Sequence, residues 1–411
     1  MPVSPYLPLS SQFFFNIGFY MVVPFLAIFL REDMLLPGSV VGLVLGLRTF
    51  SQQGLFIFGG ALSDWLGPRR LILLGCVVRI AGFVMLGMGG HIGVILAGAC
   101  LTGLGGALFS PAITSILAKV GEISESQGKR SRAQWFALLS VWGELGAVTG
   151  PMIAAMLTDI GFSAMAYTGA GLFVVAFFVL YFWLPRGDMP IMPRAKPDWS
   201  AIFGDKLFLA FVLAQSAQLF AHNQLYLALP VEITRVGGTE RDLAPMFMIA
   251  SVMIITLQMP LAKLGRRLGA HICIPVGYGL VALAFGSVAI FAPMPVLPAP
   301  WNLLPPALMV ALLSLGAMVA RPFVSDMVPG FAGGRPTGVY FGALASAGGL
   351  SVLLGNIAIG PLLDKAVTPS PEAATPWIVL AAVPLVSALA MMVITGKLRG
   401  RQPEAVASAA A

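Results

Sequence analysis

Four charged side chains lie inside long apolar runs of the sequence: Arg48, Arg79, Glu144 and Arg321. A charge at the centre of a membrane helix costs on the order of 2.5–3.5 kcal/mol, so each is a candidate functional residue. Burial also disfavours the ionised form of a carboxyl group. Glu144 is the one carboxylate that the sequence places well inside an apolar run, which makes it the first candidate for binding and releasing a proton. The alternative is a permanently neutral glutamic acid that packs between helices.

The arginines suggest different roles according to their positions. Arg48 lies one helical turn before Gln52, which places both side chains on one helix face. We expect Arg48 to contact a solute or to pair with Glu144, and hydrogen bonding to backbone carbonyls is the alternative. Arg321 lies near the end of its run and is expected to extend to the membrane surface or to bridge the two halves of the chain. The role of Arg79 stays open.

Polar residues repeat at helical spacing in two of the apolar runs. One stripe is Gln12, Asn16 and Tyr20, and the other is Gln215, Gln218, His222 and Tyr226. Such stripes either line a water-filled cavity or hold helices together. We expect them to form a substrate site together with Arg48 and Gln52. His222 is a second candidate for proton binding because imidazole titrates near neutral pH.

Metal and disulfide chemistry are not expected. The three cysteines, Cys76, Cys100 and Cys273, share no close spacing, and the three histidines are equally scattered. The sequence also lacks the G-x-x-x-x-G-K-[ST] loop that binds nucleotide phosphates. We therefore predict no metal site, no cofactor and no enzymatic activity.

Composition identifies the class of protein that must position these residues. The chain has 411 residues, of which 58% are apolar and 10% are charged, and its mean hydropathy is +0.91. A soluble globular chain has roughly 45–50% apolar and about 25% charged residues. Disorder, coiled coil, collagen and a water-soluble enzyme are therefore excluded. The sequence predicts an all-α polytopic membrane protein.

Twelve runs are long enough to cross a bilayer, which takes about 20 apolar residues in a helix. They are 8–30, 38–62, 71–89, 92–118, 133–158, 164–184, 206–230, 242–262, 271–293, 303–325, 338–362 and 377–396. The longest polar stretch between them is 185–205. It predicts a six-helix bundle at 1–184, a central loop, a second six-helix bundle at 206–396 and a tail at 397–411.

The lysines and arginines indicate how these spans are oriented. With the N-terminus in the cytoplasm, 17 of the 24 basic residues fall in inside loops or the tail and 4 fall outside. Cytoplasmic loops carry an excess of lysine and arginine, so both termini are predicted to be cytoplasmic. The same distribution accounts for the net charge of +7 without a nucleic-acid partner.

The two halves resemble each other at a nearly constant offset. A shift of 206 superimposes Gln12 on Gln218, and a shift of 210 superimposes the Gly-Pro pair at 150–151 on the pair at 360–361. An even number of spans per half gives both halves the same orientation. This is the parallel repeat of two-bundle transporters, whose site lies between the bundles near the membrane midplane.

The loop between the second and third spans reads GALSDWLGPRR. Its glycines permit a tight turn, Asp64 suits a helix N-terminus, and the arginines can bridge the bundles. The residues Gly60, Asp64, Gly67, Arg69 and Arg70 resemble the signature loop of the major facilitator superfamily. Trp65 and Pro68 stand where that family often has basic residues.

Two further segments resemble the same superfamily. The fifth span reads GELGAVTGP, in which Gly146, Gly150 and Pro151 look like the packing motif of drug:proton antiporters. The second span, GLRTFSQQG, resembles MdtH-type multidrug efflux transporters. The resemblance implies a twelve-helix fold in a bacterial-type inner membrane. It also implies proton-driven export of small amphiphilic drugs, quinolones among them, and we expect a monomer whose partners are substrate, protons and lipid.

The charges within the spans indicate which charge the transported solute carries. Three arginines against one glutamate favour neutral, zwitterionic or anionic solutes over cations. Two other interpretations stay open. One is a transporter of the same superfamily for a metabolite anion or another small organic solute. The other is a non-transporting membrane receptor or assembly factor.

Overall fold

The computed structural model describes residues 6–56, 67–184, 199–333 and 337–409, and these contain helices and no strand. The helices of the first half are α1 (Tyr6–Ile28), α2 (Gly38–Gln53), α4 (Pro68–Met88), α5 (Ile92–Ser126), α6 (Arg132–Leu157) and α7 (Phe162–Trp183). A short helix, α8 (Trp199–Gly204), precedes the second half. The second half comprises α9 (Lys206–Arg235), α10 (Leu243–Leu268), α11 (Ala270–Phe291), α12 (Leu304–Ala332), α13 (Gly338–Asp364) and α14 (Thr375–Ala409).

Ten helices among the described residues are long and apolar enough to cross a membrane. The predicted spans at 38–62 and 206–230 correspond to α2 and α9, which are not among the ten. The described part of α2 has 16 residues, and the polar stripe of α9 lowers its hydropathy. The prediction of an all-α polytopic membrane protein is confirmed, and the count of twelve spans stays a prediction.

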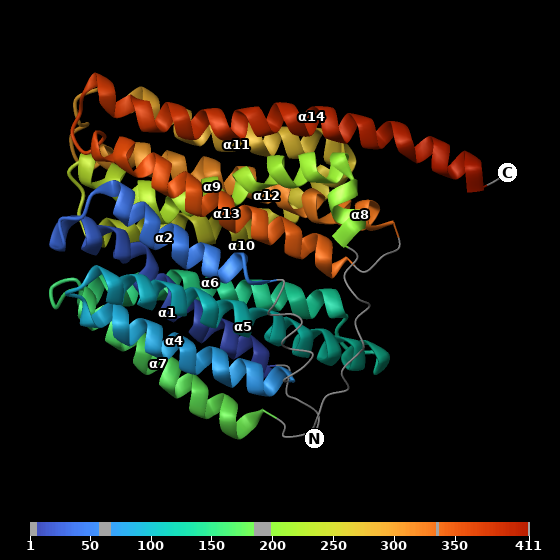
Figure 1. Ribbon diagram of the computed structural model, residues 1–411, viewed down its shortest axis with the longest axis horizontal. Helices are drawn as coiled ribbons and strands as arrows, with labels where there is room; N and C mark the ends of the chain where they lie inside the picture. Colours follow the sequence, from blue (N-terminus) through green and yellow to red (C-terminus); the bar gives the residue numbers. More distant parts are fainter. Residues whose placement is uncertain (1–5, 57–66, 185–198, 334–336, 410–411) are drawn as a thin grey trace.

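The helices run side by side in two groups, which lie one above the other in Figure 1. In the N-terminal group (α1–α7), α1 packs against α6 and α7, and α4 packs against α5 and α7. In the C-terminal group (α9–α14), α11 packs against α12 and α14. The groups meet where α2 packs against α13, α6 against α10 and α1 against α9.

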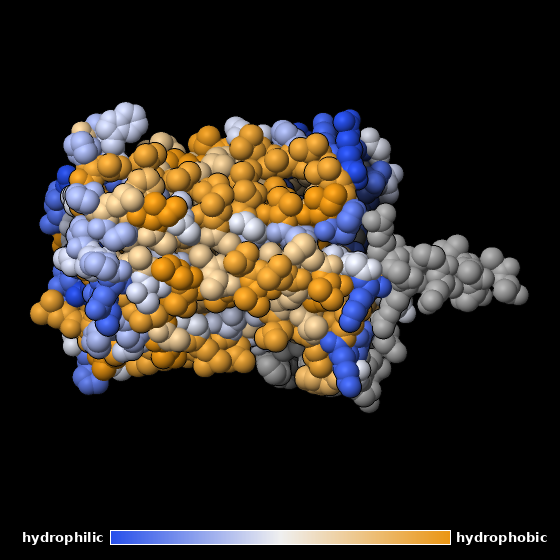
Figure 2. All heavy atoms as spheres, turned by 90° about the horizontal axis from the view of Figure 1, so that it is seen from above, coloured by the Kyte–Doolittle hydropathy of each residue, from blue (hydrophilic) through white to orange (hydrophobic). Residues whose placement is uncertain are grey.

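The surface matches a lipid environment. Figure 2 shows a broad hydrophobic band between two hydrophilic ends. Exposed Phe178 and Phe182 on α7, and Leu385 and Leu389 on α14, belong to the apolar side chains that face outward. Arginines and lysines of one end, here called the basic end, include Arg69, Arg70, Lys206, Arg266, Arg267 and Lys397. The other end is called the opposite end.

Local sequence signals set where several helices begin. Asp205 caps α9, because its Oδ1 accepts hydrogen bonds from the backbone N–H groups of Leu207 and Phe208 at 2.9 and 3.1 Å. Ser131 and Gln134 form a capping box at the start of α6. Gly269 joins α10 to α11 with a φ of +84°, a conformation that glycine adopts without a steric penalty.

Glycines bring α2 and α13 into close contact across the two groups. A Cβ atom added to Gly38 would lie 2.2 Å from the carbonyl oxygen of Gly360, and one added to Gly42 would lie 2.1 Å from that of Asn356. Any side chain at these positions would overlap the opposing backbone. The sequence therefore allows two helices from different halves of the chain to touch along their backbones.

Candidate substrate cavity between the helix groups

A cavity of about 230 Å³ lies where α1, α2 and α9 meet. Most of the predicted site residues line it: Gln12, Asn16, Tyr20, Arg48, Gln52, His222 and Tyr226. Its wall also contains Arg79 and Arg321. The structure thus places side chains from both halves of the chain around one space.

A smaller cavity of about 90 Å³ adjoins the first on the side of the C-terminal group. Gln215 and Gln218 line it, and His222, Leu219 and Arg321 line both cavities. The polar stripes of α1 and α9 therefore face connected spaces. The sequence predicts that Arg321 extends to the membrane surface or bridges the two halves, and in the structure it is exposed and lines both cavities.

Hydrogen bonds along the stripes hold several of these side chains. Asn16 accepts a bond from Gln12 Nε2 at 3.0 Å and donates to the backbone oxygen of Gly143 at 2.8 Å. In α9, Gln215 Nε2 donates to Gln218 Oε1 at 2.6 Å. Gln215 also accepts a hydrogen bond from the Tyr278 hydroxyl of α11. Part of each stripe therefore ties helices together, and the rest faces the cavities.

Arg48 is almost completely buried, with 4% of its surface exposed. Its Nη2 donates to Gln52 Oε1 at 2.6 Å, and its guanidinium lies 4.4 Å from the centre of the Phe19 ring. The predicted pairing of Arg48 with Glu144 is wrong for this structure. The reason is that Arg48 turns toward its own helix and the cavity, whereas Glu144 lies at a different contact between helices.

Glu144 links the two groups. Ser251 Oγ on α10 donates a hydrogen bond of 2.8 Å to Glu144 Oε2 on α6. The carboxyl group is partly buried and does not line either cavity. The predicted proton carrier thus lies on a contact between the N-terminal and C-terminal groups, beside the cavities and outside their walls.

Arg79 is held more firmly than Arg48. Its Nε donates to the backbone oxygen of Thr102 at 3.3 Å, and its guanidinium lies 4.8 and 5.2 Å from the ring centres of Phe15 and Phe173. These contacts fix the side chain inside the N-terminal group. It contributes positive charge to the cavity without being free to move into it.

Aromatic rings form one side of the larger cavity. The Phe19 and Tyr226 ring centres are 5.6 Å apart, and the Tyr20 and Phe247 ring centres are also 5.6 Å apart. The Tyr226 ring stacks on Phe247 at 6.0 Å. Rings from both groups therefore meet, mostly edge to face, and they offer an aromatic surface next to the polar stripes.

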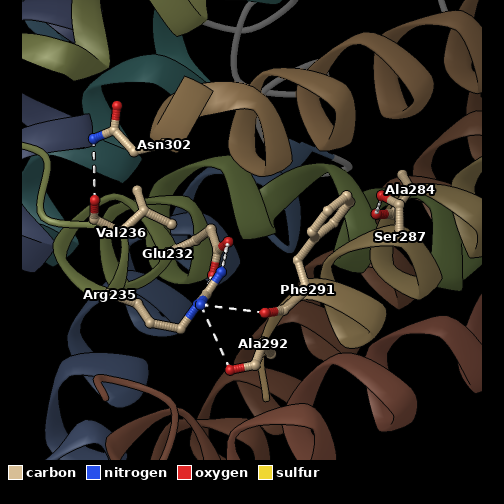
Figure 3. A network of polar contacts seen from close by, with 8 residues as sticks. All are labelled: Glu232, Arg235, Val236, Ala284, Ser287, Phe291, Ala292 and Asn302. Atoms are coloured by element: carbon tan, nitrogen blue, oxygen red, sulfur yellow. Dashed lines mark hydrogen bonds and ion pairs between the residues drawn. The ribbon is translucent and has the colours of Figure 1, made fainter. Parts of the chain in front are cut away.

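A second buried carboxylate was missed by the sequence analysis. Glu232 has no exposed surface, and Arg235 donates to its two oxygens at 2.7 and 2.6 Å (Figure 3). The span predicted to end at residue 230 continues as helix α9 to Arg235, so Glu144 is not the only carboxylate inside a long helix. The spacing of acid and base by three residues is the signal that could have indicated this pair.

Figure 3 also shows what this ion pair contacts. Arg235 Nη1 lies 3.5 Å from the backbone oxygens of Phe291 and Ala292, at the end of α11. Positive charge is favourable at a helix C-terminus. The pair therefore joins α9 to α11 within the C-terminal group and takes no part in either cavity.

Ion pairs join the two groups at the opposite end. Arg31 binds Asp364 at 2.8 Å, and Asp364 also accepts a bond of 2.8 Å from the backbone N–H of Gly38. Arg241 binds Asp159 at 2.6 Å. Each pair connects the N-terminal group to the C-terminal group at the opposite end.

The predicted latch is only partly described. Gly60 and Asp64 lie outside the described residues, Gly67 has a φ of +78°, and Arg70 is exposed. Arg69 donates to the backbone oxygen of Tyr181 on α7 at 2.8 Å. We expected Arg69 to bridge the bundles, but here it contacts a helix of its own group.

The packing motif of α6 contacts α1. A Cβ atom on Gly146 would lie 2.6 Å from the carbonyl oxygen of Phe13, and one on Gly150 would lie 2.7 Å from that of Ile17. Pro151 lies inside α6, which is continuous from Arg132 to Leu157. These small residues allow α6 to approach α1 closely and so position Glu144 next to the cavity helices.

Known proteins resemble this chain over most of its length. An uncharacterized MFS-type transporter of Mycobacterium tuberculosis (strain H37Rv) is 31% identical, covering 87% of this chain and 85% of that protein. The multidrug resistance protein MdtH of Aeromonas hydrophila is 28% identical, covering 92% of this chain and 91% of the relative.

Solved structures support the fold. The crystal structure of a POT-family peptide transporter superimposes with a TM-score of 0.79 at 14% identity and covers 96% of this chain and 94% of that one. The nucleoside transporter NupG gives a TM-score of 0.76 at 14% identity, covering 94% and 99%. Residues 9–356 match the sequence pattern of the Major Facilitator Superfamily. With its paired helix groups and shared central cavity, this chain belongs to the major facilitator superfamily and is a multi-pass membrane transporter.

Proposed function

We propose that this transporter exports small amphiphilic organic compounds, quinolone-like molecules among them, in exchange for protons. The single observation that carries the proposal is the cavity shared by the two helix groups, whose wall combines polar stripes with aromatic rings. Such a wall suits a solute with an apolar body and a few polar groups. The MdtH relative is named as a multidrug resistance protein, which supports the proposal that drug-like compounds are exported.

The orientation follows from charge. The basic end would face the cytoplasm of a bacterial inner membrane, since lysine and arginine are enriched on that side. The ion pairs of the opposite end would then close the cavity from the outside. In this proposal the structure represents the inward-facing conformation. The transporter acts as a monomer.

Glu144 is the proposed proton carrier. When it is ionised, its bond from Ser251 is charge-assisted and about twice as strong as a neutral one. Protonation removes that charge and weakens a contact between α6 and α10. One proton moving inward across about 100 mV supplies about 2.3 kcal/mol, enough to bias two conformations that differ by a few such contacts.

The test uses everted membrane vesicles that carry a respiration-generated proton gradient followed by a pH-sensitive dye. Quinolones, dyes and organic acids are added to the wild type, to Glu144→Gln and to Glu372→Gln. Glu372 is a matched control because its exposed carboxylate pairs with Lys365, away from the cavity. We expect solute-triggered collapse of the gradient in the wild type and the control, and its loss in Glu144→Gln.

Two other outcomes are informative. If the gradient still collapses in Glu144→Gln, proton antiport is supported but another residue carries the proton. His222 is then the next candidate. A complete lack of response, with the protein present in the membrane, would contradict proton-coupled export. It would favour a transporter of a metabolite anion, a function that the excess of arginine around the cavity also suits.

A further inference from the structure

The charges around the two cavities do not balance. Arg48, Arg79 and Arg321 all line the larger cavity, and among the described residues no aspartate or glutamate lines either cavity. Arg48 and Arg321 form no ion pair within the described part of the chain. Glu144 interacts with the charge of Arg321 from a distance, but its carboxylate is bonded to Ser251. Arg48 is buried, and a buried charge without a counter-charge costs several kcal/mol, so a ligand that supplies negative charge would stabilise it. Arg321 is exposed and lines both cavities, where its charge is available to the same ligand.

Unused hydrogen-bond groups face the same region. The Nε atom of Arg48 is buried and has no partner. Gln218 Nε2 and His222 Nδ1, which belong to side chains lining the smaller cavity, are also buried without partners. Buried polar atoms nearly always have partners in folded proteins. Unpartnered groups from α2 and α9 around connected cavities indicate a ligand that accepts hydrogen bonds.

We propose that the substrate carries a carboxylate and that Arg48 and Arg321 bind it from the two helix groups. This inference rests on the proposed function and specifies its substrate class. The arginine fork matches the two oxygens of a carboxylate. Gln218 would supply a further donor, and the body of the substrate would lie against Phe19 and Tyr226.

The size of the cavity limits which carboxylate substrates the site can hold. The larger cavity measures about 230 Å³, below the roughly 300–1,000 Å³ of sites for drug-sized ligands, so among the amphiphilic compounds of the proposed function it favours the smallest. A compact aromatic carboxylate fits this space and the ring surface. A purely cationic amphiphile does not, because three guanidinium groups would repel it. A zwitterion would be accepted through its carboxylate.

Direct binding tests the proposal without relying on proton movement. The purified full-length protein is equilibrated with radiolabelled 1-naphthoate, and its methyl ester, its primary amide, 1-naphthylmethylamine and inorganic phosphate serve as competitors. We expect the unlabelled acid to compete at least tenfold more strongly than the ester, the amide or the amine. Equal competition by the ester or the amine, or by inorganic phosphate, would overturn the proposal, and so would a failure of the acid to bind.

Variants test the two arginines. Arg48→Gln and Arg321→Gln should each weaken binding of the acid at least tenfold, and Arg48→Lys should retain more affinity than Arg48→Gln. Arg267→Gln removes an exposed arginine at the basic end and should leave binding unchanged. Size-exclusion profiles and thermal unfolding establish that each variant is folded, and the Lys variants replace any Gln variant that is not. Unchanged binding in folded variants of both arginines would overturn the proposal.

The two proposals fail in different ways. Carboxylate binding that depends on Arg48 and Arg321, with no proton movement in the vesicle assay, would retain the carboxylate site and contradict antiport. Proton-coupled export of neutral and cationic compounds, with equal binding of acid and ester, would retain antiport and contradict the carboxylate site.

Discussion

At the scale of single residues, two buried arginines have different kinds of partner. Arg235 has a carboxylate partner inside the protein, because Glu232 accepts two hydrogen bonds from it. Arg48 has a glutamine and an aromatic ring instead. The first arrangement is complete without a ligand and ties helices together. The second leaves a positive charge beside a cavity, which is what a binding site for an acidic group requires.

The Glu232 pair predicts a stability effect. Glu232→Gln would leave the buried Arg235 without its counter-charge, and removing one partner of a buried pair typically costs about 3–5 kcal/mol. We expect a clearly lower midpoint of thermal unfolding for detergent-solubilised Glu232→Gln. The double variant Glu232→Gln/Arg235→Met should recover much of the loss. Glu372→Gln, which breaks an exposed pair, should change little. A single variant as stable as the wild type would show that the pair does not hold α9 to α11.

At the scale of helices, contact between the halves depends on glycine. α2 and α13 touch through Gly38, Gly42 and Gly360, with no room for a Cβ atom. The polar groups Asn223 and Thr49 add a hydrogen bond of 3.0 Å between α9 and α2 nearby. This seam runs from the opposite end toward the cavity, so we expect its closeness to determine whether the two groups can separate at that end.

Gly42→Ala tests the seam. The new methyl group would meet the backbone of Asn356 at 2.1 Å and force α2 and α13 apart. In a cysteine-free background with spin labels at Leu35 and Lys365, we expect longer and broader label distances, together with transport reduced several-fold. Gly279→Ala on α11 is the control, because nothing lies within 4 Å of its added Cβ atom. Equal distance distributions for the two variants would rule out this role of the glycine seam.

At the scale of the whole molecule, we expect two ion pairs at the opposite end to favour the conformation of this structure. Arg31–Asp364 and Arg241–Asp159 each join one helix group to the other. Lys365–Glu372 lies in the same region but joins residues of the C-terminal group only. Of these three ion pairs, only the first two must break when the groups separate at this end. The Arg241–Asp159 pair is exposed and the Arg31–Asp364 pair is partly buried. Surface pairs contribute up to about 1 kcal/mol each, so together these two can shift a balanced equilibrium several-fold.

Arg31→Ala/Arg241→Ala should therefore populate the conformation that opens at the opposite end. In a cysteine-free background, Ser110→Cys introduces a thiol in the cavity wall. We expect a membrane-impermeant maleimide applied outside intact cells to label it several-fold faster in the double variant. Lys365→Ala is the control, since its pair does not join the groups, and it should label like the parent. Labelling that is the same in all three proteins would contradict a gating role for these pairs.

Several features of the chain could be predicted from the sequence because they depend only on the types and spacing of neighbouring residues. Apolar runs of membrane length predict the helices, and the spacing of Gln12, Asn16 and Tyr20 predicts a polar face on α1. The corresponding stripe on α9 was predicted in the same way. Both stripes reach the cavities, because a residue's direction along a helix is fixed by a period of 3.6.

Only the tertiary structure decided which of these faces meet. Glu144 bonds to Ser251, 107 positions away in the chain, and Arg48 turns to Gln52 instead of Glu144. The burial of Glu232 depended on where α9 ends and what packs around it. The type of a side chain sets its free energy in lipid or in water. Composition and periodicity therefore determine which segments form membrane helices and which helix faces are polar. Partners of a buried charge are set by long-range packing of helices, which no local pattern encodes.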